Sequence, residues 1–484
     1  MIRRALLICA AWFLACSTSG YGQVAPGGAL QQSLQSLEEL RREQELSKRR
    51  EQEKGTIREE ERRPAGAAAE DEAAVIFVHK IEVEDATLVP ELEVRAIVDE
   101  YEGREVSIGT LNQLPQQINE LYRLKGFLAQ AVFPEQDVSG GIVRIRVVEG
   151  RIGRIIVENN HHTRSSYITD RLTAKSGDPV RLDQLEQELL YFNITNDVKL
   201  EAELRPGEEV GLTDLHIVAL EPPNFRPTLF GDNSGRTAWG LHRFGFMLTA
   251  PSVFGYRDTF SLTGIGAEGL LAGSASYSIP ITRSGTRFGI RYDRNEIDII
   301  GGPLHGIQSS GNASDLAFFL IHPLLVTAKY QFEGLVELHG KRSETVLVTD
   351  DRFTTDVRTA VWGGNLQYFD KSGVWFIRNE FTHGFAQFGG ESNYFKYNLL
   401  LLRQQRITEE ILLIVRGAGQ ATPDQLLPST DQFFIGGIST VPGYSEALLN
   451  GDNGYFLGAE LNFPIFPKSW ESGFNLRERL KGLA

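Results

Sequence analysis

The chain has 484 residues and a net charge of −14, which predicts more than one domain and argues against nucleic acid as a partner. Hydrophobic residues make up 41% and the mean hydropathy is −0.20, which suits a soluble protein and also an outer-membrane barrel of alternating strands. Apart from the N-terminal segment, no apolar run is long enough for a spanning helix, which excludes helical membrane spans.

Residues 1–22 have the pattern of a secretory signal peptide: an arginine pair, an apolar run over 5–15 and a small-x-small cleavage site. A lipoprotein motif at Cys16 is the alternative, and Phe13 fits its usual start poorly. Both cysteines, Cys9 and Cys16, fall within the peptide. The mature chain is therefore expected to have no disulfide, no cysteine metal site and no thiol catalysis.

Residues 23–74 predict a helix over 26–63 and then a flexible linker that begins near Pro64. Charged residues and glutamines dominate the second half of the helix, as in a solvated single helix or a disordered charged run. An unimportant tail is the alternative interpretation of the whole segment. Leucines at three- and four-residue steps form one narrow apolar stripe in the first half: Leu30, Leu34, Leu37 and Leu40.

Residues 75–150 predict a compact α+β unit with the order β-α-α-β-β. Gly126 ends the second helix, because a left-handed residue at this position favours glycine. The predicted elements are a strand at 75–83, helices at 88–101 and 111–125, and strands at 127–133 and 142–148.

Residues 151–223 repeat this plan, and the Pro222-Pro223 pair ends the unit because proline cannot continue a strand ladder. The predicted elements are a strand at 152–157, helices at 166–172 and 182–192, and strands at 198–204 and 213–219.

Residues 224–484 read as strand after strand, roughly eleven before a long loop and one after it. The clearest strand alternates Tyr330, Val336 and Leu338 on one face with Gln331 and Glu337 on the other. A soluble sandwich would also alternate. Charges of both signs opposite an aromatic face favour a lipid-facing exterior and a watery interior.

A glycine-rich loop follows the eleventh strand and is too long for a tight hairpin, which is typical of a functional or a disordered loop. The motif of this loop, which is rich in residues that favour turns, consists of Gly436, Gly437, Val441, Pro442, Gly443 and Tyr444.

Nothing in the chain argues for catalysis, a cofactor or a metal. Gly264, Gly266 and Gly269 match the dinucleotide fingerprint by letters, but no βαβ unit surrounds them, so hairpin glycines are the better interpretation. The adjacent His161 and His162 read as turn residues.

Several motifs resemble those of a known family. Residues 75–150 resemble a POTRA domain in three motifs: Leu121-Tyr122 followed by Gly126-Phe127, then Phe133-Pro134-Glu135-Gln136, and then Val147-Val148-Glu149-Gly150. The loop resembles the inward-folded Val-Arg-Gly-Tyr loop of TpsB transporters, except that Pro442 stands at the arginine position. The chain is identified as a member of the TpsB transporters of two-partner secretion, the ShlB/FhaC/HecB family, which is related to the BamA outer-membrane assembly superfamily.

The resemblance implies α+β POTRA domains followed by an antiparallel transmembrane β-barrel, over 75–150, 151–223 and 224–484. The family barrel has about sixteen strands, so this one reads as truncated at its C-terminus, with a twelve-stranded closure as the alternative. In the family the loop lies inside the barrel and its arginine anchors the tip. Pro442 carries no side-chain donor and puts that anchor in doubt.

The resemblance also implies a function. The POTRA domains would capture an exported, unfolded TpsA-like protein by strand addition at Phe127, Ala129, Ala131 and Phe133. The barrel, a monomer surrounded by outer-membrane lipid, would pass this cargo to the cell surface as the helix of Leu30 to Leu40 leaves the pore. The POTRA domains would lie in the periplasm. A BamA-type insertase and a passive pore are the alternatives, and an exported hydrolase has no supporting motif.

Overall fold

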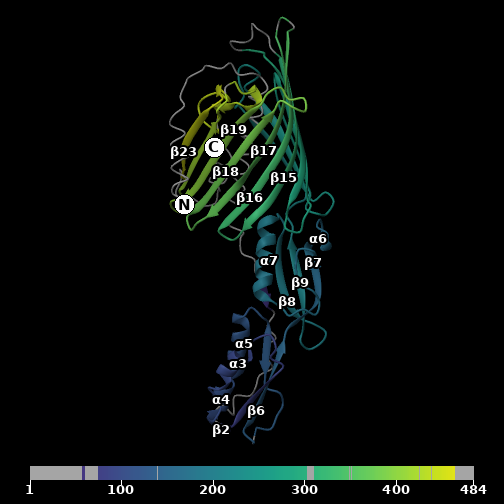
Figure 1. The fold of residues 1–484 in the computed structure, drawn as a ribbon, viewed down its shortest axis with the longest axis vertical. Helices are drawn as coiled ribbons and strands as arrows, with labels where there is room; N and C mark the ends of the chain where they lie inside the picture. The colour runs from purple at the N-terminus through teal and green to yellow at the C-terminus, as the bar shows by residue number, and fades with distance from the viewer. Residues whose placement is uncertain are drawn as a thin grey trace, which may run out of the picture. The chain divides into compact units, whose positions relative to one another are not determined.

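The structure is a computed structural model that describes residues 57–59 and 75–463, except 139, 302–309, 348, 350, 425 and 438. The predicted signal peptide, the predicted plug, which is the helix of Leu30 to Leu40 expected in the pore, and residues 464–484 lie outside this part of the chain. Contacts divide the chain into two compact units, one of which is Glu53–Pro223, while the other contains Asn224–Ala484. Figure 1 labels the elements of both units.

The first α+β domain has the predicted β-α-α-β-β plan with three differences. The predicted first strand is divided at His79, an additional strand at Arg104–Ser107 follows the first helix, and the predicted second helix is divided at Asn112 and Gln113. Pro115 lies in the first turn of α5, where its missing N–H costs nothing, so the predicted second helix begins again there. The short α4 before it is capped by Ser107, whose hydroxyl accepts from the Thr110 N–H at 3.1 Å. The elements are β2 Val75–Val78, β3 Lys80–Glu84, α3 Glu91–Val98, β4 Arg104–Ser107, α4 Ile108–Leu111, α5 Leu114–Leu124, β5 Ala129–Val132 and β6 Ile142–Glu149.

The core of this domain lies between α5 and a sheet of order β3-β6-β5. Leu114, Ile118 and Tyr122 recur every four residues on α5 and are fully buried. They pack with alternate residues of β6, such as Ile145. Gly126 follows α5 with a φ of +80°, as the sequence predicts for a helix stop.

Glu149, the last residue of β6, connects several segments of the same domain. Its carboxylate accepts from the Thr87 N–H and hydroxyl at 2.6 Å, the Leu88 N–H at 2.7 Å and the Tyr122 hydroxyl at 2.9 Å. Burial raises the pKa of this carboxyl, but the hydrogen bonds from Thr87, Leu88 and Tyr122 outweigh burial and lower it below 4.5. Glu149 therefore ties the segment before α3 to β6 and α5.

The second domain of the same unit repeats the plan with β7 Arg151–Glu158, α6 Ser165–Thr169, α7 Leu182–Thr195, β8 Lys199–Pro206 and β9 Leu212–Leu220. Its sheet has the order β1-β8-β9-β7. The added strand β1 is Ile57–Glu59, which pairs in parallel with Ala202–Leu204 of β8. The predicted helix over 26–63 is therefore wrong at 57–59, because pairing with β8 overrides the local helix propensity of this charged segment.

The two domains join through backbone pairing at the start of β5. The Leu128 N–H donates to the Val180 carbonyl at 3.1 Å, and the Leu182 N–H donates to the Gly126 carbonyl at 2.8 Å. The Arg181 guanidinium lies 5.2 Å from the centre of the Phe127 ring. The start of the predicted cargo-binding edge, at Phe127, therefore already contacts the second domain of the same chain.

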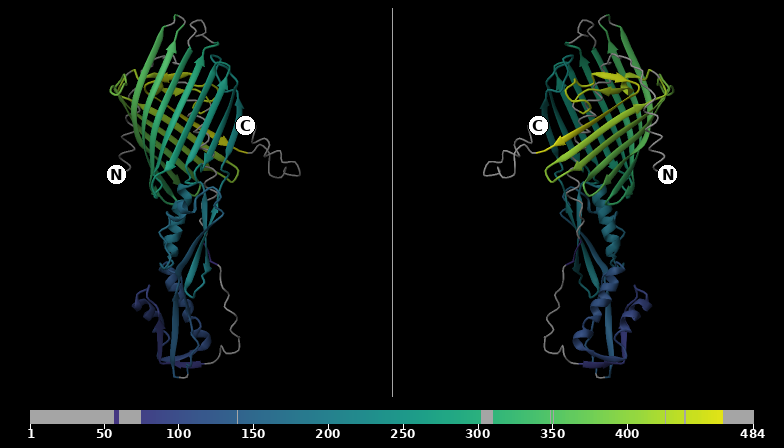
Figure 2. Two further views of the ribbon diagram at one scale, coloured as in Figure 1. Left: turned by 90° about the vertical axis from the view of Figure 1, so that its right-hand side faces the viewer. Right: turned by 90° about the vertical axis from the view of Figure 1, so that its left-hand side faces the viewer.

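Among the described residues of the second unit, twelve strands form one antiparallel sheet, eleven before the long loop and one after it. The strands curve around a common interior, as Figures 1 and 2 show. The hydrogen-bonded order begins at β10 and ends at β23. The strands are β10 Arg226–Asp232, β11 Arg243–Pro251, β12 Thr259–Ala267, β13 Leu270–Pro280, β14 Arg287–Asp298, β15 Ser310–Val326, β16 Tyr330–Val346, β17 Arg352–Phe369, β18 Gly373–Phe385, β19 Tyr394–Arg406, β20 Leu412–Ala421 and β23 Gly454–Asn462.

The two faces of this sheet have the opposite polarity to those of a soluble protein, because apolar side chains are exposed and polar side chains are buried. On β16, Val336 and Leu338 are exposed, whereas Gln331 and Lys341 are buried. Exposed aromatic rings also stack across neighbouring strands, as Trp362 and Phe381 do at 6.1 Å. An apolar outer face with a polar inner face is what hydrocarbon outside and water inside require, so the predicted alternation is confirmed.

Two smaller expectations concern the same part of the chain. Gly264 and Gly266 lie on β12, and Gly269 lies in the turn before β13, so these glycines belong to a hairpin. Within the described ranges, no helix combines the length and the apolarity that a membrane span requires.

We predict that Glu149→Gln lowers the free energy of unfolding of residues 53–223 by about 1.5–3 kcal/mol at pH 7, because the charged acceptor is lost. The folded pKa of Glu149 is lowered, so its stabilisation exists above pH 4.5 and disappears as the pH falls through the folded pKa. Denaturant unfolding at a series of pH values measures the difference.

The matched control is Glu120→Gln, which removes an exposed carboxylate of α5 that pairs with Arg123 and should cost little. Equal losses for both variants at pH 7, or a Glu149 effect that persists unchanged at acidic pH, would contradict this role.

Candidate functional site

The loop between β20 and β23 is a folded structure. It contains the short helix η2 Ser429–Asp431 and the strands β21 Phe433–Ile435 and β22 Leu449–Gly451. β21 and β22 pair in antiparallel register, from Phe433 with Gly451 to Ile435 with Leu449. In Figure 2 this yellow hairpin lies within the curve of the sheet.

The glycines of the predicted loop motif are required by the backbone. Gly436 and Gly437 have φ values of +119° and +98°. A Cβ on Gly436 would lie 2.3 Å from the Ser445 carbonyl oxygen, and one on Gly437 would lie 2.5 Å from the Glu446 carboxyl carbon. The sequence pattern therefore marks a turn in which two chain segments approach closely.

The rest of the motif forms the tip of the loop. Val441 bridges Gly437 in antiparallel fashion, and Gly443 has a φ of +92°. Pro442, Gly443 and Tyr444 are exposed. The structure thus brings the six motif residues together in one turn, with the position that resembles the family's arginine at its exposed end.

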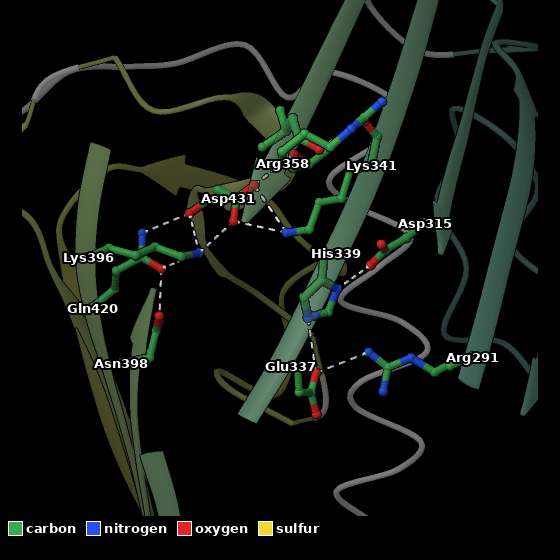
Figure 3. A network of polar contacts seen from close by, with 12 residues as sticks. Arg291, Asp315, Glu337, His339, Lys341, Arg358, Lys396, Asn398, Gln420 and Asp431 are labelled. Atoms are coloured by element: carbon green, nitrogen blue, oxygen red, sulfur yellow. Dashed lines mark hydrogen bonds and ion pairs between the residues drawn. The ribbon is translucent and has the colours of Figure 1, made fainter. Parts of the chain in front are cut away.

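Asp431, at the end of η2, attaches the loop to the inner face of the sheet. Its side chain is 1% exposed and lies between two ammonium groups, as Figure 3 shows. Lys341 Nζ on β16 lies 2.9 Å from one carboxylate oxygen, and Lys396 Nζ on β19 lies 3.1 Å from the same oxygen. Lys396 Nζ and Gln420 Nε2 also donate to the Asp431 carbonyl, at 2.9 and 3.0 Å. Three strands therefore hold one residue of the loop.

This arrangement is stable only as a set. Burial raises the pKa of the Asp431 carboxyl, yet the ammonium groups of Lys341 and Lys396 outweigh it and hold that pKa far below its usual range. Loss of the carboxylate would leave two buried ammonium groups without their counter-ion, a change that typically costs about 3–5 kcal/mol. The position of the loop therefore depends on the charges of all three side chains.

A second polar chain continues along the inner wall from Lys341. His339 Nδ1 lies 2.9 Å from Asp315, and His339 Nε2 lies 3.0 Å from Glu337. Glu337 also lies 3.6 Å from Arg291. Ionised carboxylates only accept hydrogen bonds, so both ring nitrogens of His339 donate together only as an imidazolium. The wall beside the loop is a continuous row of paired charges from β14 to β16 (Figure 3).

The other end of the loop rests on a different part of the sheet through apolar contacts. Phe434 and Ala447 are buried and belong to one cluster with residues of β12, β13 and β14 and of the turn after β10. The Arg236 guanidinium of that turn donates to the Ala447 carbonyl at 3.4 Å. The cluster on the sheet side consists of Trp239, Ile265, Leu270, Ala272, Ile297 and Ile299. Ionic contacts to β16 and β19 and apolar contacts to β12–β14 therefore hold the loop across the interior.

Sequence reasoning missed Asp431, Lys341 and Lys396. The alternation of β16 places Lys341 on the same face as Glu337 and His339, which was the available signal. The pairing itself joins positions 90 residues apart in the chain, and no local pattern contains it.

The predicted cargo-binding edge is only partly free. Ala129 and Ala131 lie on β5, an edge of the β3-β6-β5 sheet. The Ala131 N–H already donates to the Asn119 side chain of α5 at 2.6 Å. Phe133 packs against the core of the domain, and Phe127 meets the second domain. Cargo binding at these residues stays a prediction.

Comparison with known proteins agrees with this architecture. The ShlB-type POTRA domain model matches residues 76–150, and the model of the haemolysin secretion/activation protein ShlB/FhaC/HecB matches residues 211–477. The heme/hemopexin transporter protein HuxB of Haemophilus influenzae is 26% identical over 401 residues, 78% of this chain and 70% of HuxB. The outer membrane transporter CdiB of Escherichia coli is 23% identical over 459 residues, 90% of this chain and 76% of CdiB.

The solved structure of CdiB from Escherichia coli has the same fold, with a TM-score of 0.64 and 21% identity over 93% of this chain and 86% of that chain. A POTRA domain followed by a large antiparallel sheet with an apolar outer face defines an outer-membrane transporter with periplasmic POTRA domains. The chain belongs to the ShlB/FhaC/HecB family, the transporters of two-partner secretion.

We predict that Asp431→Asn loosens the loop, because one carboxylate balances two buried ammonium groups. Single-channel conductance in planar bilayers should rise, and protease should cut the loop faster. A combined Lys341→Met, Lys396→Met and Asp431→Leu variant removes every charge of the set and should recover part of the protease resistance.

The matched control is Arg342→Met, since Arg342 adjoins Lys341 on β16 but is exposed. A heat-modifiable barrel in all variants would establish assembly. If Asp431→Asn then conducts and resists protease like Arg342→Met, Asp431 does not hold the loop.

Proposed function

We propose that this transporter captures a large exported protein, still unfolded, in the periplasm and passes it through the interior of the sheet to the cell surface. The observation that carries the proposal is the loop across that interior, held on one side by ion pairs that can exchange. A passage closed by polar contacts can open without unfolding the wall. The paired charges of the wall can in turn exchange hydrogen bonds with an extended chain.

The relatives support the class of cargo. HuxB is described as a heme/hemopexin transporter, and ShlB of Serratia marcescens, 22% identical over 438 residues, as a hemolysin transporter. By analogy, the cargo of this chain is a TpsA-like exported protein. It binds the POTRA domains as an extended strand, because those domains contain sheet edges. Folding of the cargo outside the cell supplies the direction, since the periplasm holds no ATP.

Two parts of the proposal rest on the family resemblance. The transporter acts as a monomer in outer-membrane lipid, and the helix of Leu30 to Leu40 occupies the pore until cargo arrives. Deletion of residues 26–52, which spares β1, should raise single-channel conductance. Unchanged conductance of an assembled barrel would contradict the plug.

We predict that removal of this chain from its host strain eliminates one large protein from the culture medium and that the same protein accumulates in the periplasm. Quantitative mass spectrometry of both fractions identifies the cargo, and plasmid-borne wild-type chain should restore its release. Integrated levels of other outer-membrane barrels serve as the control. Unchanged medium with reduced levels of many barrels would contradict secretion and support an insertase.

A further inference from the structure

The strands β15, β16 and β17 are longer than a membrane crossing requires. They have 17, 17 and 18 residues, whereas a tilted strand needs about 9–11 to cross the hydrocarbon (Figure 1). β10 follows the periplasmic POTRA domains at Arg226, and the strands alternate in direction, so β16 ends and β17 begins on the extracellular side. Part of these strands therefore extends past the outer leaflet of the membrane.

The apolar outer face of β14–β17 ends at one level of the sheet. Ile290, Phe318 and Leu338 are opposite one another in the ladder, and all three are exposed to the outside. The next three rows of outer-face residues toward the cell surface are Tyr292, Leu316, Gly340 and Arg358, then Arg294, Ser314, Arg342 and Asp356, and then Glu296, Asn312, Glu344 and Thr354. The two rows nearest the apolar band therefore contain three guanidiniums and one carboxylate.

Small residues separate these three arginines. Ser314 lies between Arg294 and Arg342, whose backbones are two strand spacings apart, or about 10 Å. The Arg358 side chain lies beside Gly340, since a Cβ on this glycine would be 3.8 Å from Arg358 Nε. Arg342 is the next outer-face residue of β16 after Gly340. An anionic group above Ser314 or Gly340 can therefore contact two guanidiniums, and above Ser314 also a hydroxyl.

Carboxylates of the protein neutralise this group only in part. Arg342 is exposed and forms no ion pair with another described residue. Arg294 lies 2.7 Å from Glu296, but both side chains are more than half exposed, and a pair of this kind contributes little. Arg358 lies 3.7 Å from Asp356. The neighbouring strands continue the two rows with uncharged residues, which are Ala275, Gly273 and Phe385. The basic site is therefore confined to β14–β17.

We propose that the arginines of β14, β16 and β17 bind the phosphate groups of lipid A, the phosphorylated glycolipid of the outer leaflet. Its phosphates lie directly above its acyl chains, at the level where the apolar face of the sheet ends. Guanidiniums bind phosphate through paired, charge-assisted hydrogen bonds. Phe318 and Leu338, one row below, contact the acyl chains. Arg342 lies on the outer face of β16 and Lys341 on the inner face, so loss of this site leaves the ion pairs of Asp431 unchanged.

The affinity for lipid A tests the proposal. The test variant combines Arg294→Gln, Arg342→Gln and Arg358→Gln. The matched control is Arg352→Gln, because Arg352 is an exposed outer-face arginine of β17 that lies farther from the apolar face and pairs with Glu344 at 3.2 Å. Full-length chains that give a heat-modifiable barrel are titrated in detergent with diphosphoryl lipid A or with dephosphorylated lipid A. Native mass spectrometry measures the bound lipid.

We expect wild type and Arg352→Gln to bind diphosphoryl lipid A about tenfold more tightly than the triple variant does, and wild type to lose a similar factor with dephosphorylated lipid A. Millimolar inorganic phosphate should not displace the lipid, because the acyl chains also bind. Equal affinities of the triple variant and Arg352→Gln, or of the two lipids, would overturn the site.

Displacement by inorganic phosphate would show a site for free anions and would overturn the assignment to lipid. If the triple variant does not assemble, Arg342→Gln alone, which removes an exposed side chain without an ion pair, should weaken binding about threefold. Unchanged affinity of that single variant would then overturn the proposal.

Discussion

One buried carboxylate between two lysines attaches the loop to the inner face of the sheet, and in the proposed function the passage of cargo depends on that loop. Asp431 joins Lys341 of β16 to Lys396 of β19 at about hydrogen-bond distance, while Phe434 and Ala447 rest on the opposite part of the sheet. A buried ion set of this kind contributes little net stability compared with apolar packing. The ion pairs hold the loop in one defined position, and other polar groups can replace them. This property suits a gate better than a permanent contact does.

The outer face and the interior of the sheet follow from the same physical rule. Hydrocarbon outside requires apolar side chains, and a chain that crosses the interior requires polar partners, so each strand alternates between the two. In the proposed function, the POTRA domains bind cargo through the other property of strands, the open edge. In the structure, backbone groups at these edges already pair with the Asn119 side chain, with Val180 and Leu182 at the domain junction, and with β1. The proposed function therefore depends on both the sheet edges and the charges of the inner wall.

Local patterns were enough to predict the α+β units, the strand alternation and the glycine turn. Leu114, Ile118 and Tyr122 repeat at helical spacing, and Gly436 and Gly437 need backbone conformations that favour glycine. The pairing of Asp431 with Lys341 was beyond sequence reasoning, since each residue alone resembles a solvated charge. β1 was missed for a related reason: its three residues form a strand only because β8 supplies the partner. Interactions between distant segments decide both cases.

The most direct test of the loop as a gate is a covalent bond in place of the ion pair. Lys341→Cys with Asp431→Cys, joined by a short bis-thiol reagent, would fix the loop to the wall, whereas the same variant without the reagent would leave it free. Secretion of the identified cargo by the reconstituted transporter should stop when the bridge is formed and should proceed without it. Equal secretion by bridged and unbridged transporter would show that the loop does not have to move.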